Sequence, residues 1–302
     1  MTNAEPTPDP RGALAGRVAI VTGAGNGLGR AYALELAAQG ACVVVNNRWT
    51  DRQRPSSADA VTAEIAARGG RAVASYDDAA SPEAGEAMVD LALRTFGRLD
   101  AVLANAGVPE TVRLHRQTPE GFRRIFEINF FGTLQLVHAA WATLAKSDAG
   151  RVVVSASSAG LHGGDGMAAY ASSKAALLGL ARALACEGRS RGLFVNALAP
   201  YATTAMTTGH VPGAVAQNMD PAKVAPLAAW LVSPDCDVTG QTLICGGGRL
   251  RAAYAVEAPI TPLDPAAVAD SVHTAIAARP FETYPDAHQA FAAFMADAAP
   301  TR

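Results

Sequence analysis

The chain has 302 residues, half of them hydrophobic, and a formal net charge of -2. This length and composition allow one large domain with a full apolar core, and a near-neutral charge without Lys/Arg blocks argues against a nucleic acid or a membrane surface as the main partner. No apolar run reaches the roughly 20 residues that span a bilayer. The four cysteines lack the spacing of metal ligands. We therefore expect a cytoplasmic protein with reduced thiols and no metal, which acts on a small molecule.

Between residues 14 and 248, β-rich apolar runs alternate with helical patterns. The expected strands are residues 17–21, 41–46, 71–75, 99–104, 151–154, 193–197 and 241–244. The expected helices are residues 30–39, 58–68, 82–96, 118 to about 144, 170–186 and 221–231. This alternation predicts a Rossmann-type α/β domain, a doubly wound parallel sheet of seven strands in the order 3-2-1-4-5-6-7 with helices on both faces.

Both ends of the chain differ in composition from this central part. Residues 1–13 contain three prolines and are expected to form a flexible tail. Residues 249–302 are rich in alanine and show helical patterns at 265–278 and 286–295. We expect them to form a helical C-terminal extension of the same domain.

A glycine-rich loop lies between the first expected strand and the first expected helix. Its sequence is Thr22-Gly-Ala-Gly-Asn-Gly-Leu-Gly29, in which glycines 23, 27 and 29 are spaced differently from the six-residue dinucleotide fingerprint. Glycines let the backbone approach a pyrophosphate, and the helix N-terminus offers free N–H groups and a partial positive charge. The loop therefore predicts a nucleotide phosphate site; a plain tight turn is the alternative.

The ends of the second and third expected strands carry polar residues that bear on the cofactor. Asn46-Asn47-Arg48 stands where an acidic side chain commonly binds the adenosine ribose. Without that carboxylate, a 2'-phosphate is not repelled and Arg48 can pair with it, so NADP(H) is favoured and NAD(H) stays possible. In the alternative, Arg48 is only solvated and Asn47 binds the ribose of NAD. Asp77, next to Asp78, would accept from the adenine amino group or be an ordinary exposed turn residue.

Two further segments stand out in the middle of the chain. The fourth expected strand ends in Asn105-Ala106-Gly107, whose small residues allow close approach of a cofactor. Asn129 lies inside the long helical pattern that starts at residue 118. Because asparagine prefers caps and turns to helix interiors, its position predicts a local kink whose freed backbone carbonyl holds a water.

Tyr170 and Lys174 stand four residues apart at the start of a helical pattern, and Ser157 follows the strand expected at 151–154. Positions i and i+4 share a helix face, so the phenol and the ammonium point the same way. A nearby ammonium favours the phenolate and lowers the pKa of a phenol from about 10, which gives a general acid/base. Ser157 would donate a hydrogen bond to a substrate carbonyl oxygen as negative charge develops there. The alternatives are an ordinary amphipathic pair and a serine that caps a turn.

Two loops are expected to shape the substrate side. The segment from Pro200 to Met206 is expected to begin an irregular stretch, from which lids over binding sites are often formed. The Gly163-Gly-Asp-Gly166 loop has unusually small residues, which indicates room for a bulky substrate. His162 and Asp165 would either contact that substrate or simply be solvated.

The chain resembles the short-chain dehydrogenase/reductase family in the order and spacing of its motifs, which are Thr22-Gly-x-x-x-Gly-x-Gly29, Asn105-Ala-Gly107, Asn129, Ser157, Tyr170 and Lys174. This match covers about residues 14–248. Within the family, it is similar to the (3R)-hydroxyacyl-CoA dehydrogenase part of peroxisomal multifunctional enzymes and their bacterial single-domain relatives. That similarity extends to nearly the whole chain through Glu187-Gly-Arg, Ala199-Pro, Val224-Ala-Pro-Leu, the Tyr76-Asp77 pair and the C-terminal extension.

The resemblance implies hydride transfer between a nicotinamide and a secondary alcohol or ketone, with Tyr170 as general acid/base. Lys174 would lower the pKa of Tyr170 and bind the nicotinamide ribose, Ser157 would orient the substrate carbonyl, and Asn129 would hold a water that connects Lys174 to solvent. Family members are usually dimers or tetramers built on two long helices. The implied cofactor contacts are Gly23, Asn26, Gly27, Leu28, Gly29, Asn47, Arg48, Asp77, Asp78, Asn105, Ala106, Gly107, Tyr170, Lys174, Pro200, Thr203 and Thr204.

Three positions depart from the family pattern. Ala104 replaces the first asparagine of Asn-Asn-Ala-Gly, Tyr201 replaces a glycine or asparagine after Pro200, and Asn47 replaces the aspartate that selects NAD in the hydroxyacyl-CoA branch. The implied substrate is a 3-hydroxyacyl thioester or a hydroxyl on a steroid-like or polyketide-like skeleton. The alternatives on the same fold are a non-catalytic dinucleotide-binding sensor or scaffold, and lyase or isomerase chemistry.

Overall fold

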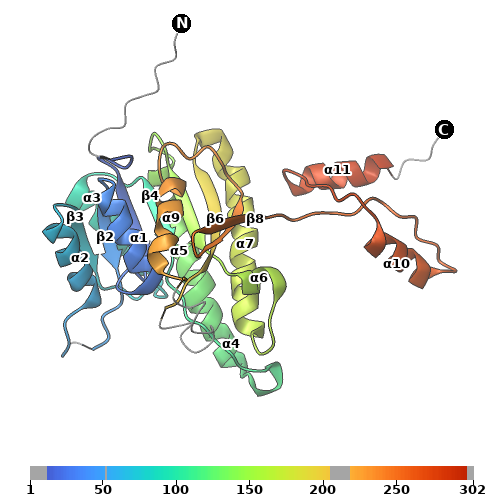
Figure 1. Cartoon of the computed structure of the whole chain (residues 1–302), viewed down its shortest axis with the longest axis horizontal. Coiled ribbons are helices and arrows are strands. Elements are labelled where there is room, and N and C mark those ends of the chain that lie inside the picture. Colours follow the sequence, from blue (N-terminus) through green and yellow to red (C-terminus); the bar gives the residue numbers. More distant parts are fainter. Residues whose placement is uncertain (1–11, 52, 205–217, 298–302) are drawn as a thin grey trace, which may run out of the picture. The chain divides into compact units, whose positions relative to one another are not determined.

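The computed structural model describes residues 12–51, 53–204 and 218–297, and its main part is a sheet with helices on both faces (Figure 1). The eight strands follow the order β3-β2-β1-β4-β5-β6-β7-β8. Strands β1 to β7 pair in parallel. The predicted doubly wound α/β sheet is therefore confirmed, and so is the order of its first seven strands. The strands are β1 Val18–Thr22, β2 Cys42–Asn46, β3 Arg71–Ser75, β4 Ala101–Ala104, β5 Arg151–Ser155, β6 Phe194–Tyr201, β7 Thr242–Gly246 and β8 Arg249–Ala253.

The eighth strand corrects the predicted count of seven. Gly247 and Gly248 have φ angles of 58° and 74°, and two consecutive residues with positive φ form the tight turn of a β-hairpin. Because a two-residue connection joins only antiparallel strands, the chain reverses after β7. It thus adds an edge strand where the sequence predicts the beginning of the helical extension.

Two apolar cores hold the helices on the sheet. One face carries α1 (Gly27–Ala38), α2 (Ser57–Ala67) and α9 (Ala225–Leu231), and the other carries α3 (Ala84–Phe96), α5 (Gly132–Leu144) and α7 (Ala168–Gly188). Successive strand residues face opposite cores: Val43 and Val45 pack in the first, and Val44 in the second. Burial on both faces explains why these strands are continuous apolar runs in the sequence.

The long helix predicted from residue 118 is interrupted. Thr118 caps α4 (Pro119–Phe126) by accepting a hydrogen bond from the Gly121 N–H at 3.0 Å. A π-helical turn, η2 (Glu127–Phe131), then separates α4 from α5. The structure also contains a short helix, α6 (Ser158–His162), that the sequence pattern does not predict. Short 3-10 turns lie at Leu114–Arg116, Arg189–Arg191 and Pro221–Lys223.

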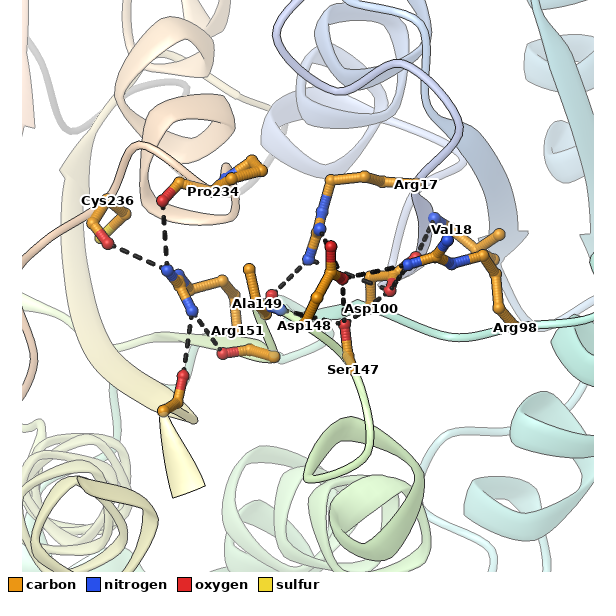
Figure 2. A network of polar contacts seen from close by, with 12 residues as sticks. Arg17, Val18, Arg98, Asp100, Ser147, Asp148, Ala149, Arg151, Pro234 and Cys236 are labelled. Carbon is orange, nitrogen blue, oxygen red and sulfur yellow. Dashed lines mark hydrogen bonds and ion pairs between the residues drawn. The ribbon is translucent and has the colours of Figure 1, made fainter. Parts of the chain in front are cut away.

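A polar network ties the amino ends of β1, β4 and β5 together (Figure 2). Asp100 is 1% exposed and accepts hydrogen bonds from the Val18 N–H at 2.9 Å, the Arg98 guanidinium at 2.7 and 2.8 Å, and the Ser147 hydroxyl at 2.6 Å. The guanidinium of buried Arg17 lies 3.9 Å from the same carboxylate. The carboxylate therefore has partners at the start of β1 and on the segments that lead into β4 and β5.

Arg151, the first residue of β5, is the centre of a second group of contacts in Figure 2. Its guanidinium donates to the carbonyls of Gly192, Pro234 and Cys236 at 3.2, 3.4 and 3.0 Å, and it lies 4.4 Å from the centre of the Phe194 ring. Burial lowers the pKa of Arg151. Both groups of contacts occupy the amino ends of the strands, so the carboxyl ends are left for ligand binding, as in other open α/β sheets.

The structure separates into two compact units, Met1–Ala252 and Ala253–Arg302. The second unit contains α10 (Val268–Ala277), α11 (Ala287–Asp297) and a bridge between Glu257 and Glu282. Its helices correspond to those expected at 265–278 and 286–295. That this unit extends the same domain stays a prediction. Within the described ranges, no helix has the length and apolar character needed to cross a membrane.

Candidate active site

Most predicted site residues lie on loops at the carboxyl edge of the sheet. The last residues of β1, β2 and β3, which are Thr22, Asn46 and Ser75, are in register. Ala104 and Ser155 end β4 and β5. Because these strands run in one direction, the loops that follow them emerge at the same edge, and they carry the predicted phosphate, adenosine and catalytic segments.

The Ser157 hydroxyl lies near the Tyr170 phenol at this edge and lowers the pKa of that phenol. Ser157 follows β5 and caps α6, since its hydroxyl also accepts from the Ala159 N–H at 3.1 Å. Tyr170 lies in the first turn of α7, and Lys174 lies one turn further along. The structure thus brings together the phenol and the hydroxyl, and Ser157 is at the same time a helix cap.

Lys174 is buried at the centre of this site. It is 5% exposed, and its ammonium donates a hydrogen bond to the Ser155 carbonyl at 2.6 Å. Burial lowers the pKa of Lys174 to about 8. Burial also raises the pKa of Tyr170, whereas the hydrogen bond with Ser157 lowers it. The structure therefore differs from the prediction that Lys174 lowers the pKa of Tyr170, because burial dominates at the phenol and the ammonium is directed at the Ser155 carbonyl.

Asn129 lies at the centre of the π-helical turn and is fully buried. Its amide oxygen accepts from the Val108 N–H at 2.8 Å, and its amide nitrogen donates to the Val108 carbonyl and the Ser173 hydroxyl, both at 3.1 Å. The predicted departure from a regular helix is thus confirmed. The Asn129 carbonyl accepts from the Thr133 hydroxyl at 3.4 Å, and the water expected on that carbonyl stays a prediction.

The glycine loop has a backbone that fits a pyrophosphate. Gly23 and Gly27 have φ angles of 63° and 53°, and a Cβ on Gly29 would lie 2.3 Å from the Gly23 carbonyl oxygen. Helix α1 begins at Gly27, and within the described residues its N-cap, Asn26, makes no side-chain hydrogen bond to the first turn. The first N–H groups of a helix have no intrahelical acceptors, so those of Gly27, Leu28 and the residues after them can bind phosphate oxygens.

The Asn105-Ala106-Gly107 segment is fixed to the end of β1. The Thr22 hydroxyl accepts from the N–H groups of Asn105 and Ala106, both at 2.9 Å, and the Asn105 amide donates to the Thr22 carbonyl at 3.0 Å. The Ser155 hydroxyl donates to the amide oxygen of Asn105 at 3.2 Å. Thr22 and Ser155 are therefore site residues for which the sequence motifs predict no role. Their positions at the ends of β1 and β5 are the signal that points to them.

A hollow of about 110 Å³ lies beside the glycine loop. It brings together six of the predicted cofactor residues, from loops that are far apart in the sequence. That this hollow holds the adenosine side of a cofactor stays a prediction. The hollow is lined by Gly23, Asn46, Asn47, Arg48, Asp78, Ala79, Ala106, Gly107, Val108 and Ile128.

Arg48 and Asp78 form an ion pair in the wall of this hollow. Their charged groups are 3.5 Å apart, and both side chains are half-exposed. Asp77 instead accepts a hydrogen bond from the Ser75 hydroxyl at 2.8 Å. Of the two predicted adenine contacts, the structure thus brings Asp78 to the described wall of the hollow and directs Asp77 toward the end of β3.

The predicted nicotinamide side begins with a longer strand than expected. Pro200 and Tyr201 belong to β6 and pair with Cys245 and Gly246 of β7. The irregular segment therefore begins after Tyr201 and not at Pro200. The reason is that β7 supplies a parallel partner as far as Gly246, which the sequence pattern of β6 alone does not reveal.

Thr203 and Thr204 follow this strand. The Thr203 N–H donates to the Met219 carbonyl at 2.6 Å. A Cβ on Gly27 would lie 3.2 Å from the Thr204 methyl group, so Thr204 reaches the glycine loop. Residues 205–217, which belong to the stretch predicted to be irregular, lie outside the described residues.

The loop of small residues after α6 is attached to the segment that follows β4. The Val112 N–H donates to the Gly166 carbonyl at 2.7 Å, and Asp165 forms an ion pair with Arg113 at 2.9 Å. Both side chains of that pair are mostly exposed. His162, the last residue of α6, is also exposed. Asp165 thus takes part in a surface ion pair.

Comparison with known proteins identifies the family. Residues 17–213 match the family model described as short chain dehydrogenase. The peroxisomal multifunctional enzyme type 2 of Mus musculus is 40% identical over 267 residues, which are 85% of this chain and 36% of that protein. A short-chain type dehydrogenase/reductase of Mycobacterium tuberculosis is 38% identical over 239 residues, which are 78% of this chain and 84% of that protein. The chain thus spans about a third of the mouse relative and most of the mycobacterial one.

Solved structures agree with this result. A short chain dehydrogenase from Mycobacterium avium superposes with a TM-score of 0.79 at 35% identity, covering 89% of this chain and 98% of that one. A short chain dehydrogenase from Mycobacterium paratuberculosis bound to NAD has a TM-score of 0.70 at 30% identity, and one from Burkholderia cenocepacia in complex with NADP has a TM-score of 0.71 at 33% identity. Each covers 78% of this chain and is itself covered to 98%. The chain therefore belongs to the short-chain dehydrogenase/reductase family, as an oxidoreductase with an NAD(P)-binding Rossmann fold that acts on CH–OH groups.

Proposed function

We propose that the chain catalyses reversible hydride transfer between a nicotinamide cofactor and a secondary alcohol or ketone, with Tyr170 as general acid/base. The observation that carries this proposal is the position of Tyr170 on α7, one helical turn before the buried Lys174 and near the Ser157 hydroxyl that lowers its pKa. Two neighbouring hydroxyl groups offer a substrate oxygen two partners, of which one transfers a proton and the other only donates a hydrogen bond.

The bound nicotinamide supplies or accepts the hydride. During reduction, Tyr170 donates its proton to the carbonyl oxygen as negative charge develops there, and Ser157 donates a hydrogen bond to the same oxygen. During oxidation, the Tyr170 phenolate accepts the proton of the alcohol. Lys174, with its pKa near 8, would hold the nicotinamide ribose and exchange protons with solvent through a water on the Asn129 carbonyl.

NADP(H) is the proposed preferred cofactor. The end of β2 has no carboxylate to repel a 2'-phosphate, and the half-exposed Arg48 lines the adenosine hollow. The Asn47 amide already donates to the Ser57 hydroxyl at 2.8 Å. A phosphate is a stronger partner for a guanidinium than a half-exposed carboxylate, because it carries more charge and has three acceptor oxygens. A 2'-phosphate would therefore replace Asp78 at Arg48, whereas NAD(H) would leave that ion pair intact.

The proposed substrate is a 3-hydroxyacyl thioester, with a steroid-like or polyketide-like alcohol as the alternative. The first is supported by the resemblance to the (3R)-hydroxyacyl-CoA dehydrogenase part of multifunctional enzymes. The second is supported by the small residues of the loop at 163–166, which leave room for a bulky skeleton. Both are secondary alcohols that the proposed chemistry oxidises in the same way.

A substrate panel tests the proposal. The purified protein is mixed with NADPH or NADH and with 3-oxoacyl-CoA, steroid and polycyclic ketones, and the loss of reduced-nicotinamide absorbance is followed. We expect turnover by the wild type and a kcat for Tyr170→Phe that is lower by about 10²–10⁴, with cofactor binding unchanged by calorimetry. Tyr254→Phe, at a tyrosine that is 66% exposed, is the matched control and should keep full activity.

Other outcomes of this panel are equally informative. Wild-type turnover by Tyr170→Phe would refute the acid/base role. Tight cofactor binding without turnover on any substrate would favour the sensor or scaffold. Conversion of a substrate without a change in nicotinamide absorbance would indicate lyase or isomerase chemistry.

We further propose a homodimer or homotetramer located in the cytoplasm. The first is supported by an apolar hollow of about 230 Å³ on α4 and the π-helical turn, lined by Phe122, Arg123, Phe126, Glu127 and Phe131. The cytoplasmic location is supported by the buried, free thiols of Cys42, Cys236 and Cys245. Light scattering after size-exclusion chromatography would give the mass of the assembly. Microscopy of a fluorescent fusion protein would show its location in the cell.

A further inference from the structure

Ser173 lies between Tyr170 and Lys174 on α7 and is fully buried. Its hydroxyl donates to the Tyr170 carbonyl at 2.8 Å and accepts from the Asn129 amide nitrogen at 3.1 Å. Both partners belong to residues with a proposed part in the reaction. The adjacent Ser172, in contrast, is exposed. Ser173 is therefore a direct polar connection between the π-helical turn and the helix that carries the general acid/base.

The hydrogen bonds of Asn129 give this connection a defined direction. The Val108 N–H can only donate, so the Asn129 amide oxygen must face it, and the amide nitrogen must serve the Val108 carbonyl and Ser173. Because the Ser173 hydroxyl accepts from that nitrogen, its own proton is directed at the Tyr170 carbonyl. Asn129 thus donates to Ser173, and Ser173 donates to the backbone carbonyl of Tyr170.

The connection lies next to the cofactor surface. A Cβ on Gly107 would be 3.1 Å from the Asn129 amide oxygen and 3.4 Å from the Lys174 ammonium. Gly107 itself lines the adenosine hollow. The Asn129 amide therefore flanks both the cofactor surface and the Lys174 ammonium. A shift of this amide would change the positions of the catalytic groups.

A serine hydroxyl that binds a carbonyl one turn back competes with the regular helix and adjusts the local bend. We propose that Ser173 is a positioning residue: its hydroxyl couples the Asn129 amide to the first turn of α7 and so holds the Tyr170 phenol against Ser157. The proposal rests on the proposed role of Tyr170 as general acid/base. The proposal adds a specific residue that determines the position of the phenol.

Ionisation of the Tyr170 phenol reports on this placement. Burial raises its pKa and the Ser157 hydrogen bond lowers it, so a phenol that moves away from Ser157 should titrate at higher pH. In the described part of the chain, no charged group on α7 or on the elements packed against it contributes to the shift; these groups include Lys174, Arg124, Glu127, Arg151, His162 and Arg189.

The test is a near-ultraviolet titration of phenolate absorbance, with the curve of Tyr170→Phe subtracted to isolate the Tyr170 signal. For Ser173→Ala we expect the pKa of Tyr170 to rise by about one unit and kcat to fall about tenfold or more, with KM changed less than about twofold. Ser172→Ala, the same substitution at the neighbouring exposed residue, should match the wild type. Ser173→Thr keeps a hydroxyl, so in this variant the pKa of Tyr170 should equal that of the wild type.

The titration needs no substrate, so it separates this proposal from the proposed function. A wild type without nicotinamide-dependent turnover would refute the function, and the titration would still decide the role of Ser173. A Ser173→Ala protein that is only less heat-stable, with the titration and pH–rate profile of the wild type, would overturn the proposal. If Ser173→Ala does not fold, Ser173→Cys, which has nearly the same shape and only weak hydrogen bonds, is judged by the same criterion.

Discussion

The Lys174 ammonium and the Ser155 carbonyl oxygen are 2.6 Å apart, buried at the carboxyl end of β5. Burial lowers the pKa of this lysine to about 8, compared with roughly 10.4 in an unfolded chain. Between these two pH values, the unfolded chain binds more protons than the folded one, so the stability of the folded state rises with pH in that window. Below about pH 8, the full cost of burying the charge applies, and it amounts to about 3 kcal/mol.

We therefore expect Lys174→Met to be more stable than the wild type at pH 7, with a difference in the free energy of unfolding that shrinks as the pH rises from 8 to 10. Urea denaturation at one-unit pH intervals measures this difference. Lys146→Met, at an exposed lysine, is the control and should show no such trend. A difference for Lys174→Met that stays constant from pH 7 to pH 10 would contradict the lowered pKa.

The ion pair between Arg48 and Asp78 leads to a prediction about cofactor choice. Arg48→Ala should raise the Kd for NADPH about tenfold and leave the Kd for NADH nearly unchanged, because only NADPH carries the 2'-phosphate. Asp78→Asn should tighten NADPH binding a few-fold, because it removes the competing carboxylate 3.5 Å from Arg48. Calorimetric titration of the wild type and the two variants with each cofactor gives the six dissociation constants.

The control for this experiment is Arg54→Ala. Arg54 is 85% exposed and pairs with Asp51, and it lies in the same loop after β2 as Arg48. Its loss removes one positive charge without changing a residue that lines the hollow. Equal affinities of the wild type for NADPH and NADH would refute the preference itself. An effect of Arg54→Ala as large as that of Arg48→Ala would point to general electrostatics in place of a specific phosphate contact.

The parallel sheet could be predicted from the sequence because its strands are buried on both faces. Runs such as Val43-Val-Val45 have few other interpretations between two helical patterns. The edge strand β8 could not be predicted in this way, since Arg249, Leu250 and Arg251 are all exposed and show no pattern of burial. Its existence depends on the two positive φ angles at Gly247 and Gly248, which the sequence permits but does not require.

The residues of the candidate site were easier to predict than their contacts. Tyr170 and Lys174 follow from the geometry of one helix, and Asn129 from its unusual place inside a helical pattern. The bonds from Asn129 to Val108 and from Lys174 to Ser155 join segments about 20 residues apart. Spacing along the chain does not say which backbone carbonyl a side chain reaches, so the burial that raises the pKa of Tyr170 was not foreseen either.

The network at the amino ends of the strands should stabilise the fold without affecting the chemistry. Asp100 is 1% exposed and faces Arg98 and Arg17, so Asp100→Asn removes a buried charge and leaves two guanidinium groups short of a partner. The expected loss is about 3–5 kcal/mol in the free energy of unfolding, measured with urea at pH 7.

Asp148→Asn is the matched control for Asp100. Asp148 contacts the same two arginines, but its side chain is 76% exposed, so the expected loss is below about 1 kcal/mol. KM for the cofactor should be unchanged in both variants, because the network lies at the edge of the sheet opposite the site. Similar losses for the two variants would mean that burial does not determine the strength of this network.

Gly29 offers a test of the glycine loop as a structural unit. A Cβ at this position would lie 2.3 Å from the Gly23 carbonyl oxygen and 2.7 Å from the Asn105 amide nitrogen. The carbonyl is backbone, and the amide is bonded to Thr22, so neither atom can move away without displacing the loop. Gly29→Ala should therefore weaken NADPH binding more than about tenfold and lower the free energy of unfolding by roughly 1–3 kcal/mol.

Gly179→Ala is the control for this substitution. Gly179 lies on the exposed side of α7, and in the described structure a Cβ there meets no atom within 4 Å. Alanine in a helix interior is more favourable than glycine by roughly 0.5–1 kcal/mol, so this variant should be slightly more stable than the wild type and bind NADPH equally well. Thermal unfolding and calorimetry distinguish the two variants. If Gly29→Ala also bound NADPH with wild-type affinity, the close packing of α1 against the loop would not be what shapes the phosphate site.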